Sequence, residues 1–257
     1  MVKRAGCSVG PGWPALGRNK QAQENLIGPA FAGTVHMHTM PTRPKVKICC
    51  IKSPEEAELA IAYGASAIGL VSAMPSGPGV ISEEAIMHIA GTVPPPIATV
   101  LLTSELRAEV IIAQQRRCRT NTIQLCDYVP SDVYQQLRHA LPGIALVQVI
   151  HVTGPESVDL AVAAATHVDA ILLDSGNPAL ATKELGGTGR THDWALSRRI
   201  REVIRKPLFL AGGLNPSNVA MAITAVRPFG IDVCRGVRTN DKLDAAKLAA
   251  FFDALPK

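Results

Sequence analysis

Short apolar runs alternate with amphipathic segments along the chain from residue 45 onward. The runs are rich in β-branched residues and show little polar alternation, which is typical of parallel strands covered on both faces. Eight runs are predicted to be strands: 46–50, 67–71, 97–102, 122–125, 145–150, 170–173, 207–210 and 231–233.

Eight segments with a helical spacing of apolar residues lie between or after these runs: 53–63, 82–90, 104–117, 131–140, 155–165, 193–204, 216–226 and 241–255. Several begin with a helix-start signal, such as Ser53 followed by Glu55 and Glu56. Eight strand–helix units in about 210 residues predict an α/β fold, a single (β/α)8 TIM barrel over residues 45–257. A doubly wound open sheet uses the same kind of strand, and the count of eight favours the barrel.

Residues 1–44 differ from the rest of the chain. They carry Gly, Pro and basic residues, a single acid at Glu24 and no hydrophobic periodicity. We interpret them as a non-barrel N-terminal extension, expected to be flexible, and they lack the continuous apolar region of a secretory signal. A leader from expression, sequence upstream of the true start, or a tail that orders over the barrel are the alternatives.

Composition and charge exclude several classes of protein. The longest apolar runs are about eight residues, well short of the roughly 18 to 20 that a membrane span needs. The net charge of +5 is modest and much of it lies near the chain ends, so no clustered basic face for nucleic acid is expected. We therefore expect neither a membrane nor a nucleic acid as partner. One barrel can be monomeric or can pair through its helices, and both remain open.

The six cysteines indicate a reduced, cytoplasmic setting. Their spacing matches no secreted disulfide framework and contains no CxxC zinc pair. They are Cys7, Cys49, Cys50, Cys118, Cys126 and Cys234.

The stretch 206–219, KPLFLAGGLNPSNV, is typical of a buried strand that enters a helix through a glycine turn. Gly212 and Gly213 would let a phosphate approach the backbone, and the next helix would offer free N–H groups and its positive dipole end. The alternative is a connection in which the glycines only relieve crowding.

In a barrel, the functional residues lie at the C-terminal ends of the strands. The longest loop follows the sixth strand, and its Gly186-Gly187-Thr188-Gly189 run can fold over a ligand. The other candidates at strand ends are Cys49, Cys50, Ser72, residues 124–127, His151, Asp174, Gly212, Gly213 and residues 234–236.

These motifs, taken in order, resemble phosphoribosylanthranilate isomerase of tryptophan biosynthesis. The matching motifs are Lys47-Ile48-Cys49, Gln124-Leu125, Leu173-Asp174, GGTG at 186–189 before Asp193-Trp194, AGGLNPSNV at 211–219, and Asp232-Val233 with Gly236-Val237. The resemblance implies an Amadori rearrangement, aldose to ketose, of an N-ribosyl anthranilate 5-phosphate. It also implies a small phosphorylated substrate and no metal or organic cofactor.

The resemblance makes Asp174 the general acid and Cys49 the general base. Ring opening needs an acid on the ring oxygen, and formation of the enolamine needs a base at the adjacent carbon. Cys49 must then have a lowered pKa and Asp174 a raised one. Without the family motif, Cys49 reads as a small buried hydrophobe and Asp174 as a cap for its loop.

The resemblance also places the substrate's phosphate where the seventh and eighth strands end. Backbone groups would hold it there. The expected substrate-binding residues are Gln124, Gly187, Gly212, Gly213, Arg235 and Gly236.

The chain departs from the family pattern at the ligand end. Cys50 and Lys52 replace the Gly and Thr of Cys-Gly-Ile-Thr, and Gly79 stands nearest the family's substrate-binding arginine. The His-Gly of Gln-Leu-His-Gly is Cys126-Asp127, His192 replaces an aromatic residue, and 234–238 read CRGVR in place of two serines, Gly, Val and Glu.

Three functions remain open at this point. Arg235 could bind the phosphate while Arg190 or Arg238 replaces the lost arginine, which would preserve the family reaction. A paralogue could instead use the Cys/Asp pair for a lyase or cyclase reaction on another anionic substrate, or the protein could bind a phosphorylated ligand without catalysis. The alternative of a zinc site formed by Cys49, Cys126, Cys234, His151 and His192 has no paired ligand spacing to support it.

Overall fold

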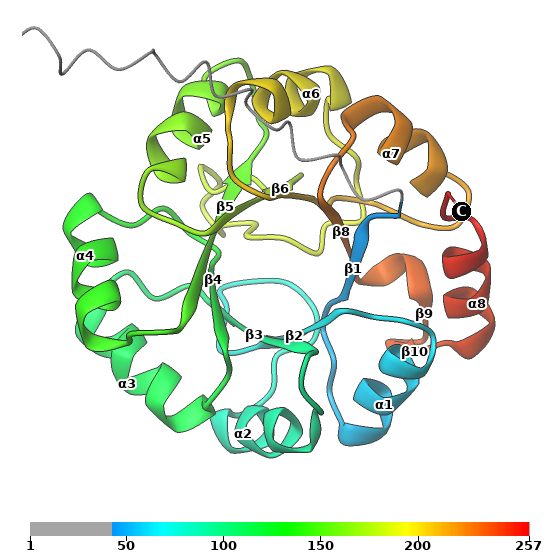
Figure 1. Cartoon of the computed structure of the whole chain (residues 1–257), viewed down its shortest axis with the longest axis horizontal. Helices are drawn as coiled ribbons and strands as arrows, with labels where there is room; N and C mark the ends of the chain where they lie inside the picture. The colour runs from blue at the N-terminus through cyan, green and yellow to red at the C-terminus, as the bar shows by residue number, and fades with distance from the viewer. Residues whose placement is uncertain (1–42, 257) are drawn as a thin grey trace, which may run out of the picture. The chain divides into compact units, whose positions relative to one another are not determined.

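A computed structural model of the protein describes residues 43–256. Eight parallel strands close into one barrel with helices around it, so the predicted TIM barrel is confirmed and the open sheet is excluded (Figure 1). The predicted extension lies outside the described residues, except for its last two positions. The strands are β1 (Lys45–Ile48), β2 (Ala67–Val71), β3 (Ala98–Thr103), β4 (Thr122–Leu125), β5 (Ala145–His151), β6 (Ala170–Asp174), β7 (Leu208–Leu210) and β8 (Gly230–Val233).

The register between neighbouring strands decides which side chains meet. β1 pairs with β8, which closes the barrel, and this pairing places Lys47 opposite Asp232. β5 pairs with β6 and places His151 opposite Asp174. Because facing residues of paired strands point to the same side of a sheet, each pair shares one face.

The helices are α1 (Pro54–Ala62), α2 (Glu83–Thr92), α3 (Ala108–Cys118), α4 (Ser131–Ala140), α5 (Ser157–Ala165), α6 (Trp194–Val203), α7 (Val219–Val226) and α8 (Ala245–Asp253). Ser53 and Ser82 cap α1 and α2, as predicted, by accepting hydrogen bonds from the backbone N–H groups of Glu56 and Ala85.

Three helices begin three or four residues later than the sequence predicts. The segment from 104 becomes helical only at Ala108, since the Ser104 hydroxyl donates to the carbonyl of Ala73. Residues 216–218 form a turn before α7.

The segment from 241 contains an unpredicted hairpin, β9 (Arg238–Thr239) and β10 (Lys242–Leu243), which follows a 3₁₀ helix at Arg235–Val237. Asn240 and Asp241 turn this hairpin in the left-handed region, with φ of 49° and 61°. Asp244 then caps α8.

The core has two layers, one between the helices and the strands and one inside the barrel. On β2, Ile68 and Leu70 belong to the outer layer, whereas Ala67 and Val71 belong to the inner layer. Both faces of each strand are therefore buried, which explains why the strands are continuously apolar in the sequence.

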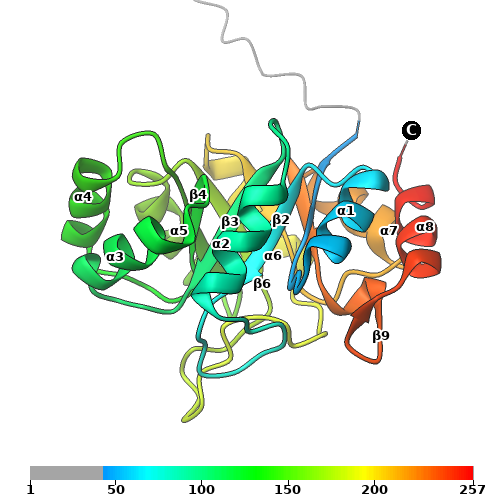
Figure 2. The ribbon, with the colours of Figure 1, turned by 90° about the horizontal axis from the view of Figure 1, so that it is seen from below.

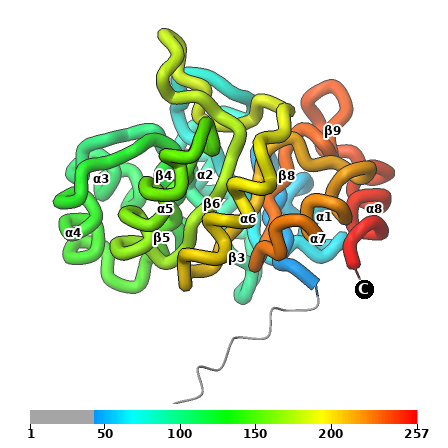
Figure 3. The backbone as a smooth tube through the Cα atoms, turned by 90° about the horizontal axis from the view of Figure 1, so that it is seen from above, coloured from blue at the N-terminus to red at the C-terminus, as the bar shows by residue number. Residues whose placement is uncertain are grey.

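The C-terminal ends of the strands lie at one end of the barrel. Figure 2 shows the loops after β2 and β6 descending together from that end, with β9 beside them, while the described chain begins at the opposite end. The two loops are joined where the Ser76 hydroxyl donates to the carbonyl of Lys183, at 2.6 Å. Figure 3 shows the same loops together from the other side. Within residues 43–256, no helix has the length and apolar character required to cross a membrane.

Candidate active site

A cavity of about 250 Å³ opens at the C-terminal end of the barrel. The loops after β1, β2, β6, β7 and β8 line it, together with side chains from inside the barrel. All eight residues predicted for the site lie on its wall. They are Cys49, Gln124, Asp174, Gly187, Gly212, Gly213, Arg235 and Gly236.

Lys47 and Cys49 lie together beneath this cavity. They are two residues apart along β1 and its end, so both side chains point into the barrel. Lys47 Nζ lies 2.8 Å from Asp232 Oδ2 on β8 and 3.5 Å from Cys49 Sγ. All three residues are buried, so the ammonium group is held between one carboxylate and one sulfur.

This arrangement favours the ionised form of Cys49. A hydrogen bond with the Cys50 thiol and the positive charge of Lys47 lower the pKa of Cys49, and together they outweigh burial and the charge of Asp232. Burial alone would lower the pKa of Lys47, but the charges of Asp232 and Cys49 hold that pKa above its ordinary value. The cation therefore persists next to the thiolate.

Asp174, at the end of β6, has the opposite tendency. Burial raises the pKa of Asp174. The backbone N–H of Ser175, which donates to Oδ1 at 2.7 Å, lowers this pKa but does not offset burial. The nearby charge of Asp232 raises this pKa further. The cavity thus contains one group shifted toward its anion and one shifted toward its neutral acid.

Gln124, on β4, contributes a polar side chain to the interior of the barrel. Its Nε2 donates weakly to Cys126 Sγ at 3.7 Å. Gln124 Oε1 and Asp232 Oδ1 are buried acceptors with no donor among the described residues. Buried acceptors of this kind are rare in the absence of a ligand or water.

The wall where β7 and β8 end is built from backbone. Gly212 and Gly213 follow β7, and the 3₁₀ helix after β8 brings Gly236 against Leu214. A Cβ at Gly236 would lie 2.0 Å from the carbonyl oxygen of Leu214, so only glycine fits there. Arg235 is exposed and is the one arginine or lysine on the cavity wall within residues 43–256.

Comparison with known proteins gives the same family from sequence and from structure. A model of the N-(5'phosphoribosyl)anthranilate (PRA) isomerase family matches residues 46–254. The N-(5'-phosphoribosyl)anthranilate isomerase of Methanocella arvoryzae is 35% identical over 208 residues, which cover 81% of this chain and 95% of that protein. The chain belongs to this family.

Other members of the PRA isomerase family agree with this assignment. N-(5'-phosphoribosyl)anthranilate isomerase 2 of Methanosarcina mazei is 34% identical over 209 residues, covering 80% of this chain and 92% of that protein. The crystal structure of the Thermotoga maritima isomerase has a TM-score of 0.69 and 31% identity, covering 82% of this chain and 98% of that one. The crystal structure of a PRA isomerase in complex with reduced 1-(o-carboxyphenylamino)-1-deoxyribulose 5-phosphate has a TM-score of 0.68 and 28% identity. The match covers 82% of this chain and 97% of that one.

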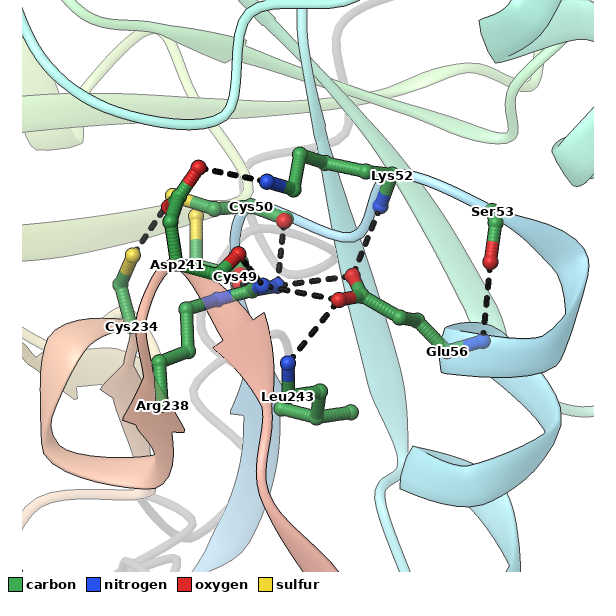
Figure 4. Close-up of polar contacts among 9 residues, drawn as sticks. All are labelled: Cys49, Cys50, Lys52, Ser53, Glu56, Cys234, Arg238, Asp241 and Leu243. Atoms are coloured by element: carbon green, nitrogen blue, oxygen red, sulfur yellow. Dashed lines mark hydrogen bonds and ion pairs between the residues drawn. The ribbon is translucent and has the colours of Figure 1, made fainter.

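Arg238 and Arg190 do not take the place of the arginine missing from the PRA isomerase pattern. The Arg238 guanidinium is buried against Glu56 of α1, with Nη1 and Nη2 each 3.0 Å from a carboxylate oxygen (Figure 4). Arg190 pairs with Glu184 within the loop after β6. Arg235 therefore remains the arginine placed to meet a ligand in the cavity.

Two of the departures from the PRA isomerase pattern touch each other. A Cβ built at Gly79 would lie 2.4 Å from the Cβ of Cys50, and Gly79 has a φ of +81°. A side chain at position 79 is therefore incompatible with Cys50 in its present position. Glycine at position 79 is therefore what allows Cys50 its present position.

Lys47 and its partner Asp232 were not predicted to have a role in the site. The signal was present, because a lysine and an aspartate in the middle of apolar strand runs must be paired when both faces of the strand are buried. What the sequence did not supply was the register of β1 against β8.

The described residues contain no group of three or more His, Cys, Asp or Glu side chains arranged to hold a metal ion. His151 Nε2 contacts the carbonyl of Cys126 at 2.9 Å, and His192 Nε2 contacts the Ser197 hydroxyl at 2.8 Å. Burial lowers the pKa of His192 to about 4. One ring nitrogen of each histidine considered for a zinc site is thus already in a polar contact within the protein.

Replacing Lys47 tests its effect on Cys49. Lys47→Gln is expected to raise the pKa of Cys49, because the thiol then faces the Asp232 carboxylate without its cation. Alkylation of Cys49 by iodoacetamide near neutral pH, followed by peptide mass spectrometry, is expected to slow by about tenfold or more. The double variant Lys47→Gln/Asp232→Asn removes both charges and so avoids an unpaired buried charge. Its alkylation rate should lie between those of the wild type and Lys47→Gln.

The matched control is Lys52→Gln. Lys52 lies three residues beyond Cys49 and pairs with Asp241 at 2.5 Å, outside the cavity. Its loss should leave the alkylation rate unchanged. Equal rates in the wild type, Lys47→Gln and the double variant would contradict the role of Lys47.

Replacing Arg238 tests the ion pair behind the β1 loop. Arg238→Met leaves Glu56 without its guanidinium and is expected to lower the free energy of unfolding by about 3–5 kcal/mol, measured by urea denaturation. Burial raises the pKa of Glu56, but the hydrogen bonds and charge of Arg238, together with the backbone N–H groups of Leu243 and Lys52, lower it below its ordinary value of 4.5. The stabilisation is therefore full above pH 4.5 and is lost as the pH falls through the folded-state pKa.

Arg117→Met is the control for this measurement. Arg117 pairs with Glu83 on the surface, so its loss should change the free energy of unfolding much less. If both variants lost the same stability, or if the loss in Arg238→Met did not shrink in acid, the Arg238–Glu56 pair would not be the cause.

Proposed function

We propose that the protein catalyses the Amadori rearrangement of N-(5'-phosphoribosyl)anthranilate, converting the aldose to the ketose within tryptophan biosynthesis. The observation that carries this proposal is the pair of groups that line the cavity, with the pKa of Cys49 lowered by the Cys50 thiol and by Lys47 and the pKa of Asp174 raised by burial. Membership of the PRA isomerase family supports it.

In the proposed reaction, the Asp174 carboxyl donates its proton to the ring oxygen of the ribosylamine, and the bond between C1 and that oxygen breaks. The product is an open-chain protonated imine. The Cys49 thiolate then removes the proton from C2, and the electron pair of that bond forms the enolamine. The Asp174 carboxylate then accepts the proton of the C2 hydroxyl while the Cys49 thiol returns a proton to C1, which gives the ketose and restores both side chains to their starting states.

Lys47 supports this reaction from beneath the cavity. A thiol of ordinary pKa is mostly protonated at neutral pH and is a poor base. The ammonium group 3.5 Å from Cys49 Sγ compensates the thiolate's charge in a region that excludes water. Asp232 in turn holds the ammonium in place, so the base depends on three residues.

We place the phosphate of the substrate at the backbone wall formed by Gly187, Gly212, Gly213 and Gly236, with the Arg235 guanidinium as its cation. Glycine there lets the phosphate oxygens reach backbone N–H groups. We assign Gln124 to the sugar end of the same substrate, because its side chain lines the cavity and Oε1 lacks a donor.

One observation favours a second candidate function. The substrate of the family carries a carboxylate as well as a phosphate, and Arg235 is the one arginine or lysine that the described residues place on the cavity wall. A paralogue that uses Cys49 and Asp174 for a lyase or cyclase reaction on another phosphorylated substrate would need no second cation.

We assign either reaction to the cytoplasm. The five cysteines within the described residues are free thiols, which supports a reducing compartment.

Kinetics of Cys49→Ser and Asp174→Asn test the first function. Each variant is expected to lower kcat by about 10²–10⁴-fold with little change in KM, because each removes a proton-transfer group. Turnover is followed as the loss of fluorescence of freshly generated phosphoribosylanthranilate.

Cys118→Ser, a change in the buried end of α3, is the control and should keep the wild-type kcat. A folded wild-type protein that binds phosphate but does not turn over this substrate would reject the isomerase and favour the second candidate.

Kinetics of Arg235→Gln test the phosphate site. Loss of a charge-assisted hydrogen bond is expected to raise KM by about tenfold and to weaken competitive inhibition by inorganic phosphate by a similar factor. Lys242→Gln is the control, because Lys242 is an exposed cation of the neighbouring hairpin that does not line the cavity. An unchanged phosphate inhibition constant in Arg235→Gln would place the phosphate elsewhere.

A further inference from the structure

Cys50 and Cys234 form a pair of thiols beside the general base. Cys50 follows β1, Cys234 follows β8, and their sulfurs lie 2.7 Å apart although the residues are 184 positions apart in the sequence (Figure 4). Both line the cavity, next to Cys49 on one side and Arg235 on the other. Neither thiol has a role in the proposed proton transfers.

The surrounding contacts hold Cys50 in this position. Its φ of 63° lies in the left-handed region, which costs free energy for a residue other than glycine. Arg238, fixed by Glu56, donates hydrogen bonds to the carbonyls of Cys49 and Cys50 (Figure 4). The backbone of Gly79 lies directly against the Cys50 side chain. The Cys50 sulfur is thus directed toward Cys234.

The two sulfurs differ in access. Cys234 is partly exposed to the cavity, whereas Cys50 is buried. Hydrogen bonds with Cys234 and Cys49, together with burial, raise the pKa of Cys50. Cys234 is therefore the sulfur that a reagent reaches first, and the Cys49 thiolate lies ready to accept the proton of Cys50.

We propose that Cys50 and Cys234 are a redox modification site, which a small-molecule disulfide converts to an intramolecular disulfide that reversibly inactivates the enzyme. The Cys234 sulfur attacks one sulfur of the reagent, whose S–S bond breaks, and the proton of Cys234 leaves with the first thiol. The Cys50 sulfur then attacks the mixed disulfide at Cys234. The proton of Cys50 passes to Cys49 and from Cys49 to the leaving sulfur, which departs as the second thiol. Two protein thiols lose two electrons and two protons, and one reagent disulfide becomes two thiols.

The bridge affects the base directly. A disulfide at Cys50 has no S–H to donate to the Cys49 thiolate, so the largest influence that lowers the pKa of Cys49 is lost. The bridge also ties Cys234, and with it the adjoining Arg235, to the end of β1. This consequence for turnover rests on the proposed isomerase function, whereas formation of the bridge does not.

The test uses the full-length protein incubated with oxidised glutathione. The intact mass is expected to fall by the mass of two hydrogens, with no glutathione adduct. Peptide mapping should show a disulfide between Cys50 and Cys234 and distinguish it from any disulfide that involves Cys7. Phosphoribosylanthranilate turnover should fall by about tenfold or more, the size expected for loss of a hydrogen bond to a charged group, and dithiothreitol should restore it.

Two variants isolate the pair. Cys234→Ser should form no bridge, and whatever turnover it has should not change when it is oxidised. Cys118→Ser, which removes a buried thiol on α3, should form the bridge and lose turnover as the wild type does.

Other outcomes would overturn the proposal. They are a bridge between Cys49 and Cys50, a stable glutathione adduct at Cys49, the absence of any bridge, a bridged wild type with full turnover, or oxidative inactivation that persists in Cys234→Ser. If the protein did not turn over phosphoribosylanthranilate at all, the isomerase function would fail. Intact mass and peptide mapping would then still show whether the Cys50–Cys234 disulfide forms. The effect of the disulfide on the cavity would be measured as a loss of affinity for inorganic phosphate on oxidation, which dithiothreitol should reverse.

Discussion

The active end of the barrel depends on one buried ion pair, between Lys47 and Asp232. A lone ammonium group inside a barrel is too costly to desolvate, and the carboxylate that compensates it comes from a strand 185 residues away. The same contact therefore lies across the β1–β8 seam, where the first and last strands close the barrel, and supplies the cation that favours the Cys49 thiolate. Fold closure and activation of the base share one interaction.

The sequence predicted what depends on local patterns. Apolar runs gave all eight strands, because both faces of each strand are buried, and the capping serines marked α1 and α2. The residues predicted for the site line one cavity because strand ends of a parallel barrel converge at one end. The ion pairs Lys47–Asp232 and Arg238–Glu56 were not predicted, since both depend on which residues face each other across distant elements. The hairpin at Arg238–Leu243 was missed because Asn240 and Asp241 adopt left-handed turns that no helical spacing reveals.

The departures from the family pattern are connected in space. Cys50 lies against Gly79, contacts Cys234, and has its carbonyl bound by Arg238, which replaces a glutamate of the family pattern. In the sequence these are four separate substitutions. In the structure they form one cluster around the end of β1, where each residue restricts the choice at the others. A single reversion toward the family pattern, such as a side chain at Gly79, would therefore meet a steric conflict with Cys50.

This cluster surrounds Cys49, the proposed general base. The adjacent Cys50 thiol and the Lys47 ammonium group, 3.5 Å from Cys49 Sγ, both lower the pKa of Cys49. A lowered pKa makes a thiol reactive toward disulfides as well as toward a substrate proton. Cys49 is buried, whereas Cys234 is partly exposed to the cavity and lies against Cys50. An oxidant entering the cavity thus meets a pair that can close on itself, which leaves Cys49 unmodified and able to recover when the pair is reduced.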